Sequence, residues 1–151
     1  MPEDFFSPRV GPSRIPPEGL SKAEILASGA AECLDAAECL DCYGKPDHTG
    51  GYILLFHAIE LGLKAFLLNH DVPEKDLRDE YRHDLNTLPH DATQNGLSLT
   101  YPSAKDLNEW INEWHERVRI RYEFDSERQL PQSKHLISIA KEIIATTSTS
   151  V

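Results

Sequence analysis

The chain has 151 residues, and its 25 acidic residues outnumber its 15 basic ones, which gives a formal net charge of −10. A chain of this length is typical of a single domain and is long enough to bury a core of its own. Because phosphate binding needs a positive field, the charge argues against a protein that coats nucleic acid, although it allows a local basic patch.

Composition divides the chain into an N-terminal arm (1–17), a body (18–145) and a small polar tail (146–151) that is expected to fray. Five of the ten prolines lie in the arm, which predicts an extended or irregular backbone there. No long apolar run follows the early acidic residues, so we expect no signal peptide. We expect the arm to pack on the body or on a partner subunit, because it is rich in apolar residues: Phe5, Phe6, Val10 and Ile15.

The three cysteines are Cys33, Cys39 and Cys42. An odd number of cysteines without a secretion signal predicts reduced thiols and a cytoplasmic location. Cys39 and Cys42 form a C-x-x-C pair near His48, but a zinc site usually needs four ligands and the chain has no second such pair. All three lie in an alanine-rich helical pattern, where cysteine acts as a small apolar residue. We therefore expect no metal site and no cofactor.

The first two helical patterns cover 21–43 and 52–69. Ser21 and Glu24 have the spacing of a capping box, and Gly44 and Pro46 end the first pattern. The second pattern is apolar on nearly every side, which predicts a helix at the centre of a bundle. It is short and contains charged residues, so we expect no membrane span.

Three polar residues of this central segment, His57, Glu60 and Lys64, share one helical face. Glu60 precedes Lys64 by four positions, the favourable order for an ion pair. The face is either a solvent-exposed stripe or a polar seam inside a helix pair or dimer.

Residues 71–82 are predicted to be a connector with one short helical turn. A third helix is expected over 84–95, where Pro89 either kinks the helix or begins it anew, and Gly96 is expected to end it. A fourth helix begins at the cap Ser103 and runs to Tyr122, and Pro131 opens a fifth. Because no segment alternates like a strand, we predict an all-α fold, an up-and-down bundle of four to five helices.

Charge is uneven along this layout: the stretch 18–47 is net acidic and 117–141 is net basic. The basic stretch is the one plausible anion-binding surface, and its ligand-binding candidates are Arg117, Arg119, Arg121 and Tyr122. Alternatively, its cations offset the acidic first helix across the bundle.

Three segments together resemble HEPN domains over about 21–144. These segments are His57–Leu68, which contains an acid before an L-K-A-x-L run, then Arg82–Leu85 with its H-D-L, and Arg119–Tyr122 with its R-Y. The proline that often follows this R-Y is Glu123 here. The signature side chains are His57, Glu60, Lys64, His83 and Asp84.

The resemblance implies a helical bundle, often dimeric, of a kind that recurs in nucleotide- and RNA-linked stress, defence and toxin–antitoxin systems, where a nucleotidyltransferase-type protein can be the partner. Some members are metal-independent ribonucleases with an R-x(4–6)-H motif at a dimer interface. Histidine can act there as a general acid or base while arginine holds the phosphate. The spacing occurs twice, at Arg128 and His135 and, alternatively, at Arg78 and His83.

About one such pair is expected by chance in a chain with this composition. Pro131 lies between Arg128 and His135, which places Arg128 off the helix that bears His135. No glycine-rich phosphate loop, G-x-S-x-G or H-E-x-x-H motif is present, and His115 is most simply a surface or interface residue. The sequence thus favours a dimeric interaction or nucleotide- or RNA-binding module without catalysis, with a ribonuclease as the alternative.

Overall fold

The structure is a computed structural model that describes residues 19–42, 49–80, 87–119 and 130–149. This part of the chain forms six helices and contains no strand, so the all-α prediction is confirmed. The helices are α1 (Lys22–Cys42), α2 (Thr49–Asn69), α3 (Glu74–Glu80), α4 (Leu88–Gln94), α5 (Ala104–Arg119) and α6 (Ser133–Thr149).

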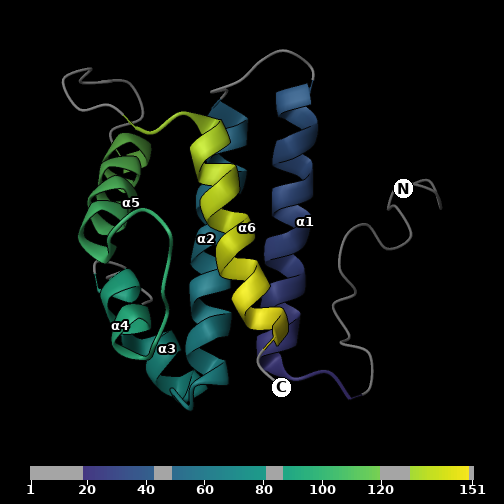
Figure 1. The fold of residues 1–151 in the computed structure, drawn as a ribbon, viewed down its shortest axis with the longest axis vertical. Coiled ribbons are helices and arrows are strands. Elements are labelled where there is room, and N and C mark those ends of the chain that lie inside the picture. Colours follow the sequence, from purple (N-terminus) through teal and green to yellow (C-terminus); the bar gives the residue numbers. More distant parts are fainter. Residues whose placement is uncertain (1–18, 43–48, 81–86, 120–129, 150–151) are drawn as a thin grey trace, which may run out of the picture.

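Helix α2 lies at the centre of the molecule (Figure 1). It packs against α1 and α6, which also contact each other, and against α4 on its other side. In Figure 1, α1 and α2 run in opposite directions, and α6 crosses in front of α2. The central position predicted from the apolar pattern of 52–69 is confirmed, because ten residues of α2 are buried.

By length and composition α2 could cross a membrane, and among the described helices it alone passes that test. More than half of its most apolar stretch is buried inside the fold, as in the core helix of a soluble protein. The described part of the chain therefore gives no indication of a membrane span.

The contact between α2 and α6 depends on a glycine. A Cβ atom built on Gly62 would lie 2.8 Å from Cγ2 of Ile143, which is fully buried. Only a residue without a side chain permits this approach. Helix α1 meets α2 through small residues as well, since Ala30 is fully buried and a Cβ on Gly29 would touch Leu61.

Helices α4 and α5 cover the face of α2 that α1 and α6 leave open. Three aromatic rings join α5 to α2: Trp114 stacks on Phe56 with ring centroids 5.3 Å apart and on Tyr52 at 5.9 Å. The hydroxyl of Tyr52 donates a hydrogen bond of 2.8 Å to the carbonyl of Pro131, just ahead of α6. The first turn of α2 is therefore tied both to α5 and to the start of α6.

The predicted helix signals at three ends are confirmed. At the start of α1, Oγ of Ser21 accepts a hydrogen bond from the backbone N–H of Glu24. At the start of α5, Oγ of Ser103 accepts one from the backbone N–H of Asp106. After α4, Gly96 has a φ of 105° and the backbone N–H of buried Leu97 donates to the carbonyl of Ala92. Together with a bond from Gly96 to Thr93, this is a Schellman motif.

Other boundaries differ from the prediction. Four to five helices were expected and six are present, because 74–80 is a helix and not a connector with one turn. The negative charges of Glu74 and Asp76 in its first turn interact favourably with the helix dipole, and burial of Leu77 fixes the helix to the core. Helix α2 begins at Thr49, three residues before the expected start, through two glycines that propensity disfavours.

Helix α4 begins at Leu88 with Thr87 as its cap, which places Pro89 in the first turn, where a missing N–H costs nothing. Helix α6 begins at Ser133, two residues after Pro131, and continues to Thr149. Helix α6 therefore includes 146–149, which the sequence analysis placed in the tail, and Thr147 is buried. The arm 1–17 lies outside the described residues, as does the expected continuation of the fourth helix to Tyr122.

Candidate functional site

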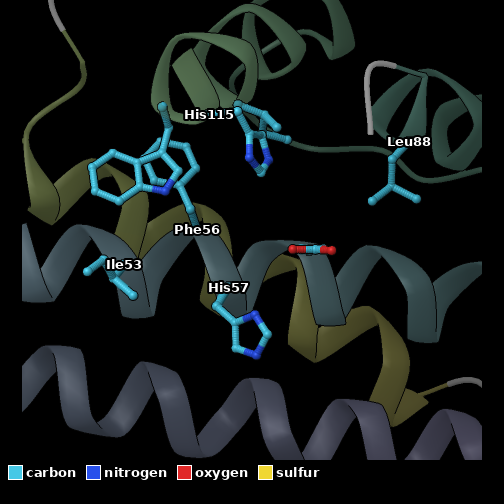
Figure 2. A pocket seen from close by; sticks show the side chains of 8 residues that line it. Ile53, Phe56, His57, Leu88 and His115 are labelled. Atoms are coloured by element: carbon cyan, nitrogen blue, oxygen red, sulfur yellow. The ribbon is translucent and has the colours of Figure 1, made fainter. Parts of the chain in front are cut away.

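A pocket of about 310 Å³ opens between α2, α4 and α5 (Figure 2). Helix α2 supplies four of its lining residues, α5 three and α4 one. They are Ile53, Phe56, His57, Glu60, Leu88, Ile111, Trp114 and His115. It is larger than a second pocket of about 180 Å³ beside α4 and α5, whose described lining has no ionisable side chain.

Apolar groups form most of the lining. The rings of Phe56 and Trp114 are nearly parallel, with an angle of 8° between their planes. Leu88 is fully buried and closes the side toward α4, whereas Ile53 is 52% exposed at the surface of α2.

The polar part of the lining consists of His57, Glu60 and His115. Lys64 Nζ donates a 2.9 Å hydrogen bond to Oε1 of Glu60, one helical turn away. The side chains of this ion pair are only 24% and 22% exposed, for Glu60 and Lys64 respectively, while His57 is exposed. The polar face predicted on this helix is therefore not a solvent-exposed stripe throughout, because part of it borders the pocket; the alternative of a polar seam in a dimer stays a prediction.

The two histidines reach the pocket from different helices. Figure 2 shows His115 pointing from α5 toward α2 and Leu88 reaching in from α4. In the same view the ring of His57 lies at the other edge of the α2 ribbon. Each neutral imidazole offers one hydrogen-bond donor and one acceptor, so the site combines a carboxylate with two adaptable polar groups.

The predicted arginine–histidine pairs cannot be placed as pairs. Arg128 and His83 lie outside the described residues. His135 is exposed in the first turn of α6 and is absent from the pocket lining, and the backbone of Arg78 belongs to α3.

The basic stretch is described only in part. The backbones of Arg117 and Arg119 form the last turn of α5, directly after Trp114 and His115 of the pocket. The remaining candidates lie in segments that the structure does not describe: Arg121, Tyr122 and Asp84.

The cysteines do not gather into a site in the described residues. Cys33 is half-buried and Cys39 is exposed. Burial, assisted by the negative charge of Glu32, raises the pKa of the Cys33 thiol, which disfavours the reactive thiolate. Within the described ranges, no three His, Cys, Asp or Glu side chains lie close enough together to hold a metal ion.

No protein-family model, no curated protein and no solved structure matches this chain. The resemblance to HEPN domains thus stays a prediction from its three motifs. Of the signature side chains, the structure brings His57 and Glu60 to one pocket together with Trp114 and His115. Sequence reasoning missed this contribution of α5, because the only local signal was an aromatic residue next to a histidine on an otherwise charged helix.

Proposed function

We propose that this chain is a HEPN-like up-and-down bundle that acts, as a dimer in the cytoplasm, as a nucleotide- or RNA-binding module without catalysis. Its setting would be a stress, defence or toxin–antitoxin system, where a nucleotidyltransferase-type protein is a possible kind of partner. The order of the long helices supports the bundle: in Figure 1, α1 and α5 run upward while α2 and α6 run downward.

The observation that carries the proposal is the pocket on α2. Two of the predicted signature side chains, His57 and Glu60, line it together with an aromatic wall from Phe56 and Trp114. Concave, mostly apolar sites with a few polar groups are the usual form of a ligand site. Aromatic faces bind nucleic-acid bases without sequence preference.

The basic stretch gives this surface a means to hold phosphate. Arg117 and Arg119 follow the pocket residues Trp114 and His115 within about one helical turn on α5. A base against the aromatic wall and a phosphate beside the end of α5 would then belong to one ligand. Arginine is well suited to the phosphate because its guanidinium group can bond two phosphate oxygens at once.

Binding is tested by titrating the full chain into fluorescently labelled single-stranded RNA and labelled nucleotides in EDTA, with anisotropy as the readout. The proposal predicts saturable binding that weakens as salt increases and leaves the RNA intact. The variant pair Arg117→Gln and Arg119→Gln should weaken binding, whereas Lys105→Gln, an exposed cation at the start of α5, should leave it unchanged. Absence of RNA and nucleotide binding by the wild type would refute the proposal.

The dimer is tested separately. The dimer is proposed from the resemblance to HEPN domains, which are often dimeric. We expect light scattering to give twice the chain mass of 17.0 kDa. A monomer at high protein concentration would remove the dimer from the proposal.

The second candidate function is a metal-independent ribonuclease. One observation favours it: His135 is exposed in the first turn of α6, where an imidazole is accessible to substrate. RNA cleavage in EDTA that is lost in His135→Ala or His83→Ala would establish the enzyme and overturn the non-catalytic module. His90→Ala, an exposed histidine of α4, is the matched control and should leave any cleavage unchanged.

A further inference from the structure

The pocket between α2, α4 and α5 has the size of a site for one flat ring system. Its volume of about 310 Å³ is at the lower end of the range of ~300–1,000 Å³ for small-molecule pockets. The nearly parallel rings of Phe56 and Trp114 line it. Because these two rings stack on each other, they offer a ligand their edges and at most an outer face, and such edge-on or offset ring contacts favour a planar ligand.

The polar groups at the pocket are suited to a neutral ligand that has N–H groups. Oε1 of Glu60 is occupied by Lys64, while Oε2 has no hydrogen-bond partner among the described residues. The imidazoles of His57 and His115 can each donate or accept. A ligand with both donors and acceptors on its edge would satisfy Glu60 and His115.

The lining is unsuited to a phosphate group. None of the described lining residues is lysine or arginine, and Glu60 places a negative charge beside the cavity. A phosphate in this position would lose its hydration, and Lys64, the cation next to Glu60, is already paired with that carboxylate. The chemistry of the pocket therefore separates the base of a nucleotide, which fits, from its phosphate, which does not.

We propose that this pocket binds a single nucleobase-like heteroaromatic ring against Phe56 and Trp114, with an N–H of the ring donating to Oε2 of Glu60. His115 contacts the ring from α5, while His57 lies at the far edge of α2. This assignment rests on the proposed function, because it names the part of a nucleotide or RNA that the pocket holds. Sugar and phosphate stay outside it.

The first experiment follows binding through Trp114 in the full chain. The variant Trp110→Phe leaves Trp114 as the only tryptophan, and its fold is checked by circular dichroism. The probes are guanosine, adenosine, uridine, guanosine 5′-monophosphate and inorganic phosphate. We expect the nucleosides to change the fluorescence, the monophosphate to bind at least as tightly as guanosine because its phosphate lies outside the pocket toward the end of α5, and phosphate alone to have no effect.

The second experiment measures variants by equilibrium dialysis with labelled guanosine. Trp114→Ala should weaken binding about ten-fold, from the loss of a stacking partner. Glu60→Gln and His115→Asn change polar groups at the rim with little effect on packing, and each should weaken binding about three-fold or more. The matched control is Glu109→Gln, an exposed carboxylate of α5 outside the lining, which should leave the affinity unchanged.

The results separate this inference from the proposed function. If no nucleoside binds, or if Glu60→Gln and His115→Asn bind guanosine as the wild type does, the base pocket is overturned. If the wild type binds labelled RNA while these two variants bind it equally well, the proposed function stands without the pocket. If the wild type binds neither RNA nor nucleosides, both fail.

Discussion

The close approach of α2 to α6 predicts that Gly62→Ala destabilises the fold. An added Cβ would lie 2.8 Å from Cγ2 of Ile143, closer than non-bonded carbon atoms tolerate. Ile143 is fully buried and branched at Cβ, so in a helix it has one strongly preferred side-chain conformation and cannot move its Cγ2 away. The helices must separate or the side chain must leave its preferred conformation.

The magnitude follows from two opposing effects. Overpacking of a tight core costs about 1–3 kcal/mol, and the stiffness of Ile143 places this site in the upper half of that range. Alanine regains about 1 kcal/mol over glycine through helix propensity. The free energy of unfolding should thus fall by about 1–2 kcal/mol, which corresponds to a Tm lower by about 3–6 °C for a chain of this size.

Two other glycines provide matched controls on the same type of change. A Cβ on Gly51, in the first turn of α2, meets nothing within 4 Å, so Gly51→Ala should raise the unfolding free energy by up to about 1 kcal/mol. Gly29→Ala makes an ordinary contact of 3.4 Å and should be neutral or slightly stabilising. Urea denaturation measures all three variants. A Gly62→Ala protein as stable as the wild type would refute the packing argument.

A second substitution tests the cause directly. Ile143→Leu moves the branch away from Cβ and so removes Cγ2 at nearly constant volume, at a cost below about 1.5 kcal/mol in the wild type. In the Gly62→Ala background it should cost less than that, or restore stability. Exact additivity of the two changes would show that the clash with Ile143 is not the reason for the loss.

Three further predictions concern other parts of the molecule. Tyr52→Phe removes the hydrogen bond to the chain ahead of α6 while it keeps the ring, so urea denaturation should show a loss of about 0.5–1.5 kcal/mol. Glu142→Ala removes the acceptor of both the backbone N–H and the hydroxyl of Thr100, at 2.6 and 2.9 Å. Because both bonds are exposed to solvent, the loss should be about 0.5–1.5 kcal/mol, and an unchanged free energy of unfolding would contradict this. Cys33 should react with iodoacetamide more slowly than exposed Cys39, because its raised pKa leaves less of the reactive thiolate. The same raised pKa makes stability depend on pH: the contribution of Cys33 is complete below the pKa that its thiol has in the unfolded chain, and it is lost as the pH rises through the pKa of the folded state.

Local signals in the sequence were sufficient for several helix ends. The capping serines at 21 and 103 and the Gly96–Leu97 pair act within one helical turn, so their partners are already specified by the spacing. The central helix was also predictable, because a helix that is apolar on nearly every side must be buried by other elements on nearly every side.

Other elements depend on contacts that spacing does not specify. Helix α3 is short and highly charged, so its own sequence favours it little. Burial of Leu77 in the core shared with the other helices holds it in position. Helix α2 includes Gly50 and Gly51 although their propensity opposes it, because tertiary packing outweighs a cost of about 1 kcal/mol per glycine.

The candidate site could be predicted only in part. His57 and Glu60 were recognisable on one helical face, but the pocket exists because α4 and α5 return to that face from residues 30 to 60 positions later. Leu88 carried no local sign of a shared site, and the only local signal at Trp114 was the histidine next to it. The predicted anion-binding residues and arginine–histidine pairs involve segments beyond the described ranges, so they stay predictions.

The central claim is that the pocket on α2 is where a nucleotide or RNA ligand is bound and left intact. The most direct test is two-dimensional NMR of the isotopically labelled chain with a short single-stranded RNA in EDTA, combined with a gel of the RNA after the titration. The account predicts shifts concentrated at the pocket residues of α2, α4 and α5 and at the end of α5, with RNA of unchanged length. Shifts confined to the region of His135 together with cleaved RNA, or no shifts at all, would contradict it.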